Sequence, residues 1–184
     1  LPEVAIVNNV EFDHADIYAD LDAVKKAFKG LVSRIREPGR LIACVESENV
    51  RDCIRLAKVP VISYARNSSF KAQYYLDQVN STKEGIQFQV CKEGKVLDSI
   101  QMLVPGEHNA INALAVWIEC FELGIDPALI KKGLSTFRGV KRRQEERGEE
   151  NGVLVIDDFA HHPTAVKETV SALKAKYKGR KLVV

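Results

Sequence analysis

The stretch that decides the fold lies near the C-terminal end of the sequence and reads Val153-Leu154-Val155-Ile156-Asp157-Asp158-Phe159-Ala160-His161-His162-Pro163-Thr164. Its apolar first third is rich in β-branched residues, which predicts a fully buried strand. A helical pattern follows directly, with Val166, Val170 and Leu173 on one face. In α/β folds, ligands bind where strand carboxyl ends meet helix N-termini. The polar residues between this strand and helix are therefore candidate ligand-binding residues, unless an aspartate there only caps the helix.

The composition is that of an ordinary globular protein. The chain has 184 residues, 46% of them hydrophobic, and a formal net charge of +2. Lys and Arg are spread along the chain, so nothing in the charge pattern calls for nucleic acid or a membrane partner. There is neither a signal-peptide pattern nor an apolar run of membrane-spanning length. The cysteines lie far apart and form no zinc-type spacing, which indicates buried free thiols in the reducing cytoplasm: Cys44, Cys53, Cys91 and Cys120.

The order of the predicted elements indicates an α/β protein. Apolar runs at 4–7, 41–45 and 61–64 predict strands, and the helical patterns at 21–35 and 49–56 separate them. Strands that alternate with helices favour a parallel sheet. The next three segments alternate apolar and polar residues, which predicts an antiparallel meander with one wet face: 70–79, 85–91 and 96–104.

The last third of the chain divides in two. A broad apolar stripe predicts a helix over 107–124, and Asp126-Pro127 predicts the start of a second helix that runs to about residue 137. The basic segment 138–143 breaks the pattern, so we place a domain boundary near 137–141. Beyond it we expect a hairpin, a helix and a final strand, at 144–156, 165–177 and 181–184.

Two polar clusters precede the one described first. Asp13 and His14 follow the first strand, and a carboxylate beside an imidazole can bind a divalent ion or orient water. Asn109 and Asn112 lie one turn apart at a predicted helix start, next to His108. An amide carries both donors and acceptors, as the recognition of a purine edge requires. Each cluster could instead consist of helix caps and surface residues.

The third cluster combines opposite charges. Arg142 and Arg143 precede the Asp-Asp and His-His pairs by about fifteen residues. A guanidinium fork suits phosphate oxygens, and an aspartate suits ribose hydroxyls. Together the second and third clusters hint at a nucleotide, whereas a solvated basic linker is the simpler alternative.

Taken in order, three segments resemble the motifs of the Mur ligase family: 8–17, 106–112, and 139–143 with 157–164. The resemblance covers essentially the whole chain. It implies that residues 1–138 are the later part of a P-loop-type ATPase domain, with a mostly parallel sheet and a small antiparallel meander. Residues 139–184 would begin a Rossmann-like C-terminal domain.

The resemblance also implies an activity. Mur ligases are ATP-dependent amide ligases of peptidoglycan metabolism that activate a carboxylate as an acyl phosphate. The wording Glu-Phe-Asp-His-Ala-Asp and Asp-Phe-Ala-His-His favours the branch that recycles a murein tripeptide onto UDP-N-acetylmuramate. The branch that adds L-alanine to UDP-N-acetylmuramate is the alternative. Either way the family resemblance implies ATP and Mg²⁺ as cofactors and a cytoplasmic location.

Site residues follow from the same resemblance, motif by motif. They comprise a catalytic Mg²⁺ ligand, two nucleotide-binding amides, a catalytic arginine at the γ-phosphate, a ribose-binding aspartate and a histidine near the nucleotide. In that order these are His14, Asn109 with Asn112, Arg143, Asp158 and His161.

One part of the family pattern is missing. No phosphate-loop motif, G-x-x-x-x-G-K-[ST], occurs in the sequence. We therefore expect this segment to be a piece of a longer enzyme and to be inactive by itself. Two rival classes remain: a two-metal phosphohydrolase built from the Asp-His clusters, which would need no phosphate loop, and a non-catalytic interaction module.

Overall fold

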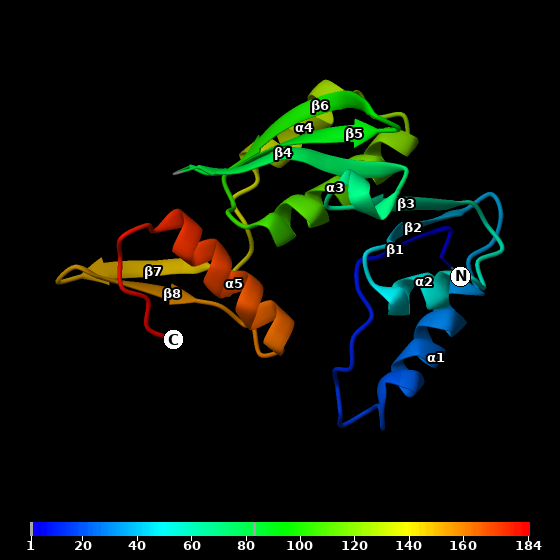
Figure 1. Cartoon of the computed structure of the whole chain (residues 1–184), viewed down its shortest axis with the longest axis horizontal. Helices are drawn as coiled ribbons and strands as arrows, with labels where there is room; N and C mark the ends of the chain where they lie inside the picture. Colours follow the sequence, from blue (N-terminus) through cyan, green and yellow to red (C-terminus); the bar gives the residue numbers. More distant parts are fainter. Residues whose placement is uncertain (1, 83) are drawn as a thin grey trace.

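The computed structural model describes residues 2–82 and 84–184 and shows a mixed sheet with helices on both faces, followed by a smaller hairpin–helix unit (Figure 1). The sheet has six strands in the order β1-β2-β3-β4-β5-β6. Strands β1 to β4 run parallel, and β4 to β6 are antiparallel. This confirms the predicted parallel sheet with an antiparallel meander. The strands are β1 (Val4–Val7), β2 (Arg40–Cys44), β3 (Val61–Ala65), β4 (Tyr74–Thr82), β5 (Gly85–Lys92) and β6 (Lys95–Met102).

Two hydrophobic cores lie on opposite faces of the sheet. Strand β2 serves both, because Leu41 and Ala43 belong to one core while Ile42 and Cys44 belong to the other. A strand that is covered on both faces is apolar on both, as β2 is from Leu41 to Cys44. Helices α1 (Leu21–Val32) and α2 (Glu48–Ile54) cover the face with Leu41 and Ala43. Helices α3 (Glu107–Glu122) and α4 (Pro127–Thr136) cover the opposite face. A short 3₁₀ helix, η1 (Ser68–Phe70), lies between β3 and β4 in the sequence.

Local sequence signals account for the ends of these helices. The Asp20 carboxylate accepts a hydrogen bond from the Ala23 amide at 2.8 Å and caps α1. Asp126 caps α4 in the same way through Ala128, with Pro127 in the first turn, as predicted. The chain leaves α3 through Gly124, whose φ of +77° lies in the left-handed region.

The second unit is the hairpin of β7 (Glu145–Glu150) and β8 (Val153–Asp157), followed by α5 (Pro163–Lys176). The prediction that β8 is fully buried is wrong, because Val153 and Val155 are 63% and 54% exposed. A two-stranded hairpin with one helix leaves one of its faces in water, so only alternate residues of the strand are covered. Residues 181–184 form no strand, since no neighbouring strand in the described part of the chain supplies a ladder.

Two smaller expectations are settled by the same structure. The strand predicted at 4–7 is β1, an edge strand that is only partly buried, with Val7 buried and Ile6 40% exposed. The four cysteines are free thiols, of which only Cys120 is partly exposed. No helix within residues 2–82 and 84–184 is both long enough and apolar enough to cross a membrane.

The two units are docked through a glycine. Gly106, the N-cap of α3, has a φ of +104°, and a Cβ built on it would lie 2.6 Å from Cε1 of His108 and 2.9 Å from Cβ of Ala172. Ala172 and Leu173 of α5 are buried. Only a residue without a side chain therefore allows α5 to pack against the start of α3.

We expect Gly106→Ala to destabilise the protein by about 2 kcal/mol or more, because it combines a strained φ with a steric overlap at the docked helix. The control is Gly30→Ala in the last turn of α1, where a Cβ would meet nothing within 4 Å. That change should stabilise by roughly 0.5–1 kcal/mol through helix propensity. Denaturant unfolding measures both, and equal shifts in the two variants would contradict the docking role of Gly106.

Candidate functional site

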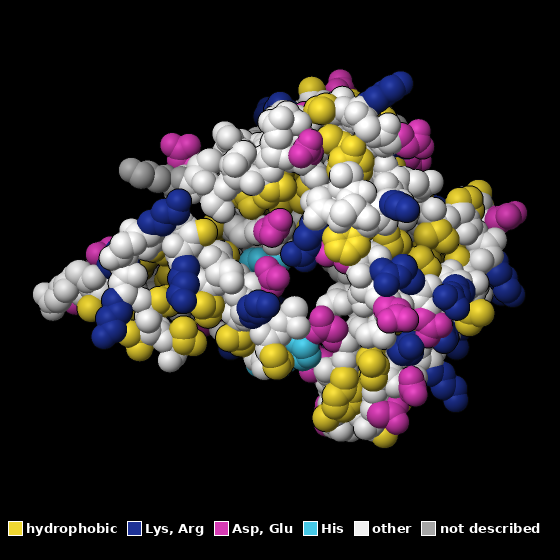
Figure 2. Space-filling view, in the orientation of Figure 1, with side chains coloured by type: hydrophobic (Ala, Val, Ile, Leu, Met, Phe, Trp, Pro, Cys, Tyr) yellow, Lys and Arg dark blue, Asp and Glu magenta, His cyan; other side chains and the backbone are white. Residues whose placement is uncertain are grey.

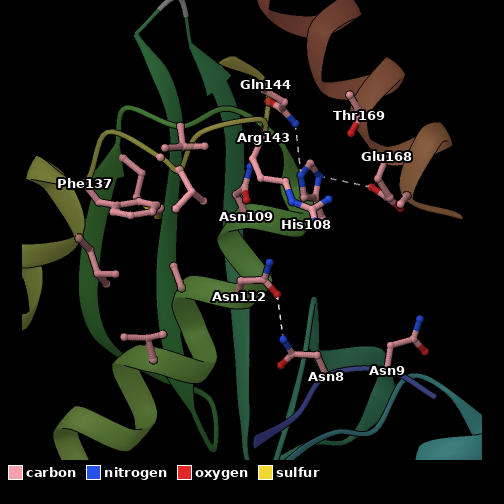
Figure 3. Close-up of a pocket in the computed structure, with 18 of the residues that line it drawn as sticks. Asn8, Asn9, His108, Asn109, Asn112, Phe137, Arg143, Gln144, Glu168 and Thr169 are labelled. Carbon is pink, nitrogen blue, oxygen red and sulfur yellow. Dashed lines mark hydrogen bonds and ion pairs between the residues drawn. The ribbon is translucent and has the colours of Figure 1, made fainter. Parts of the chain in front are cut away.

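A cavity of about 1130 Å³ lies between the two units, alongside α3 and α4 (Figure 3). This volume is large enough for a nucleotide-sized ligand. One end is apolar, with Val116, Leu134 and Phe137 among its walls. The other end is polar and receives residues from both units: Asn8, Asn9, His108, Asn109, Asn112, Arg143, Gln144, Asp158 and Glu168. Four of the predicted site residues, Asn109, Asn112, Arg143 and Asp158, are thus brought together around one space.

The two asparagines sit on the first turns of α3 and face the cavity. The cap of α3 is Gly106, so the alternative that Asn109 is merely the N-cap is wrong. The Asn109 side chain donates from Nδ2 to the Pro105 carbonyl oxygen at 2.7 Å. The Asn112 side chain accepts at Oδ1 from Nδ2 of Asn8 at 3.1 Å. Each amide is held by one hydrogen bond and keeps its other end for a ligand.

Arg143 occupies a tight turn at the start of the second unit. Its neighbours Arg142 and Gln144 have φ values of +59° and +51°, so the chain reverses sharply around it. The Arg143 guanidinium carbon lies 5.7 Å from the centroid of the Phe159 ring. No carboxylate in the described part of the chain pairs with this guanidinium. Its positive charge is therefore available to an anion in the cavity.

Asp158 fixes that turn. Its Oδ2 accepts from the backbone amide of Gln144 at 2.8 Å, and its Oδ1 accepts from that of Ala160 at 2.7 Å. The Phe159 amide in turn donates to the carbonyl oxygen of Arg142 at 2.8 Å. Asp158 is not a helix cap, since the N-cap residue of α5 is His162 and no side chain caps this helix. Each carboxylate oxygen retains a lone pair for a further donor, such as a hydroxyl group.

His108 joins the two units and was not among the predicted site residues, although it was noted beside them. Its Nε2 lies 3.3 Å from Nε2 of Gln144, and its Nδ1 lies 4.0 Å from Oε2 of Glu168. Burial lowers the pKa of His108, partly offset by the charges of Glu168 and Asp158. The neutral ring can accept at Nε2 from the Gln144 amide, which places its proton on Nδ1. His108 Nδ1 and Gln144 Oε1 are buried without a hydrogen-bond partner in the described part of the chain, so both can serve a ligand or water.

His14 and His161 do not line the cavity. His14 is exposed on the loop after β1 with a φ of +56°, and its backbone amide donates to Asp13 Oδ1 at 2.7 Å. This hydrogen bond is the main reason that the pKa of Asp13 is lowered, and the nearby histidines lower it further. His161 lies beside the same aspartate, with 3.9 Å between its Nε2 and Asp13 Oδ2.

A second bridge between the units lies next to these histidines. His162 places Nδ1 3.2 Å from Oε2 of Glu11 and Nε2 3.2 Å from the carbonyl oxygen of Phe12. The Thr164 hydroxyl donates to the same Glu11 oxygen at 2.9 Å. The polar clusters of 11–14 and 161–164, which fall in different predicted domains, therefore meet in space, and Figure 2 shows a histidine beside an acidic side chain where the two units meet. Nevertheless, no three His, Cys, Asp or Glu side chains in the described residues are grouped to hold a metal ion.

Comparison with known proteins identifies the family. The family model described as the Mur ligase middle domain matches residues 1–119, and the one described as Mur ligase, glutamate ligase domain matches residues 142–184. The first match alone covers more than half of the chain. The chain belongs to the Mur ligase family.

Several curated relatives carry the same name. A UDP-N-acetylmuramate–L-alanine ligase from Clostridium tetani is 40% identical over 174 residues, which cover 94% of this chain and 38% of the relative. The ligase of the same name from Desulfosudis oleivorans is 36% identical and covers 100% of this chain and 40% of the relative. The chain therefore spans about two fifths of the length of these relatives.

Solved structures agree on the fold. A UDP-N-acetylmuramate–alanine ligase from Thermotoga maritima has a TM-score of 0.79 at 28% identity and covers 97% of this chain and 39% of that one. A murein peptide ligase from Psychrobacter arcticus has a TM-score of 0.71 at 30% identity and covers 97% of this chain and 36% of that one. MurF from Acinetobacter baumannii is similar in fold, with a TM-score of 0.82 at 21% identity and coverage of 96% of this chain and 38% of that one.

Proposed function

We propose that this chain belongs to an ATP-dependent ligase of peptidoglycan synthesis that joins L-alanine to UDP-N-acetylmuramate in the cytoplasm. The observation that carries the proposal is the cavity, where Asn109 and Asn112 from the first unit face Arg143 and Asp158 from the second. The motif wording favoured a murein tripeptide as the amine substrate. The relatives instead carry the name of the L-alanine ligase, which was the alternative, and we adopt it.

In this proposal the cavity holds ATP between two domains, residues 1–138 and 139–184. Asn109 and Asn112 contact the base, Asp158 receives a ribose hydroxyl, and Arg143 faces the γ-phosphate. ATP supplies the phosphoryl group that activates the substrate carboxylate as an acyl phosphate. The chain's own contribution is positioning and positive charge, which are the main means of catalysing phosphoryl transfer. The apolar end of the cavity, around Val116 and Phe137, excludes water from the base.

A Mg²⁺ site is proposed from the family resemblance of the segment that contains His14. Mg²⁺ prefers oxygen ligands, and beside His14 the Asp13 carboxylate offers such a ligand, but no three His, Cys, Asp or Glu side chains in the described residues are grouped to hold a metal ion. We keep His14 as one catalytic ligand of a Mg²⁺ site and assign no step to the ion. His161 lies beside Asp13 and is proposed to be near the phosphates rather than at the base.

A murein tripeptide is the second candidate for the amine substrate. It is favoured by the 30% identity to two murein peptide ligase structures, of which the second, from Neisseria meningitides, covers 77% of this chain. The two candidates differ in one assay. Purified full-length enzyme receives ATP, Mg²⁺ and UDP-N-acetylmuramate with either L-alanine or L-alanyl-γ-D-glutamyl-meso-diaminopimelate. We expect L-alanine to be ligated at least about tenfold faster, as measured by ADP release and product mass. A preference for the tripeptide would reverse the assignment, and no ligation of either would contradict the proposed function.

The arginine pair gives a matched test of the site. Arg143→Lys should lower kcat by roughly 10²-fold or more, because lysine lacks the planar fork that neutralises phosphate oxygens. Arg142→Lys should cost much less, since Arg142 stacks on Phe159 at 4.9 Å and does not line the cavity. Steady-state kinetics with saturating substrates measure both variants. Equal losses at the two positions, or none at either, would mean that the pair is only a basic surface.

A further inference from the structure

Asn109 presents a hydrogen-bond acceptor to the cavity. Its side-chain nitrogen donates to the carbonyl oxygen of Pro105 at 2.7 Å. A backbone carbonyl can only accept, so the amide of Asn109 cannot turn around without losing this bond. Its Oδ1 is therefore the atom that remains for a ligand.

Asn112 presents the opposite group, because a chain of two hydrogen bonds fixes it. The buried hydroxyl of Tyr64 donates to Oδ1 of Asn8, and Nδ2 of Asn8 donates to Oδ1 of Asn112 at 3.1 Å. Figure 3 shows Asn8 beneath Asn112, with the nitrogen of Asn112 directed away from Asn8. The donor Nδ2 of Asn112 is thus left for the cavity.

Tyr64 sets the direction of this chain. It is 0% exposed in the core beneath α3, so its O–H must donate to a protein acceptor or lose a hydrogen bond. Burial also raises the pKa of Tyr64 above its ordinary value, which keeps the proton on the hydroxyl. If Asn8 turned around, its NH₂ group would face that hydroxyl and leave the proton without an acceptor. Asn8 itself is exposed, so this hydrogen bond rather than packing orients it.

We propose that Tyr64 and Asn8 are positioning residues that orient Asn112, so that the cavity offers one acceptor and one donor and selects a 6-amino purine over a 6-oxo purine. This inference rests on the proposed function, which places a nucleotide in the cavity. Adenine offers an amino donor beside a ring-nitrogen acceptor, which complements Asn109 Oδ1 and Asn112 Nδ2. In the same pose a 6-oxo purine would place its oxygen against Asn109 Oδ1, an unfavourable contact between two acceptors.

The test compares the binding of ADP and IDP, which differ at the 6-position, by titration calorimetry of the full-length enzyme without turnover. We expect wild type to bind ADP about tenfold or more tightly than IDP. Tyr64→Phe removes the donor that orients Asn8, and the preference should fall to about threefold or less. The control is Tyr74→Phe on the neighbouring strand. Tyr74 is also buried, and its hydroxyl donates to Glu122 Oε1 at 3.1 Å, but neither residue lines the cavity. This variant should keep the wild-type preference.

A second variant, Asn8→Asp, should reverse the orientation of the Asn112 amide without removing any buried side chain. Asn8→Asp can still accept from Tyr64 but offers only an acceptor to Asn112, so the Asn112 amide should turn its oxygen to the cavity. ADP binding should weaken and the preference should fall at least as far as in Tyr64→Phe. The proposal is overturned if wild type shows no preference, if Tyr64→Phe keeps it, or if Tyr74→Phe loses it equally.

Asn112→Ala distinguishes a failure of the nucleotide site from a failure of the positioning role of Tyr64 and Asn8. If this variant binds ADP as tightly as wild type, the nucleotide is not in this cavity and the proposed function fails with it. If it weakens ADP binding about fivefold or more while Tyr64→Phe keeps the wild-type preference, the nucleotide site stands and only the positioning role of Tyr64 and Asn8 is wrong.

Discussion

The candidate site depends on the carboxylate of Asp158. Two backbone amides, those of Gln144 and Ala160, donate to its two oxygens and hold the turn that carries Arg143 against the loop after β8. Charge-assisted hydrogen bonds to backbone amides are among the stronger ones in proteins. Without them, the guanidinium of Arg143 would have no fixed position relative to α3. The rest of the site is built around this fixed point.

Two bridges then set the second unit against the first. On one side Gly106 allows α5 to dock at the start of α3, where His108 faces both Gln144 and Glu168. On the other side the Glu11 carboxylate contacts the His162 ring and accepts a hydrogen bond from the Thr164 hydroxyl. Each bridge includes a partly exposed polar contact, His108 with Glu168 in the first and His162 with Glu11 in the second, and interfaces of this kind between units of one chain are suited to relative motion. A ligand that touches both units would favour the docked arrangement by its differential affinity.

Much of this fold can be predicted from the sequence, and the exceptions have physical causes. Alternating patterns and caps such as Asp126-Pro127 identified the elements, because these signals are local. The prediction that β8 is buried was wrong, because the burial of a strand depends on how many other strands and helices cover it, and no local sequence pattern records that number. The four residues around the cavity were predicted from motifs. The parts played by His108, Gln144, Glu168 and Tyr64 required the structure, since each acts through a partner distant in sequence.

In the proposed site, one nucleotide contacts both units at once. Hydrogen exchange of the full-length enzyme, followed by mass spectrometry with and without ADP, tests it most directly. We expect ADP to slow exchange together in two segments, 105–113 at the start of α3 and 140–146 around Arg143. Protection in only one of these segments, or in neither, would contradict the account of a nucleotide site between the two units.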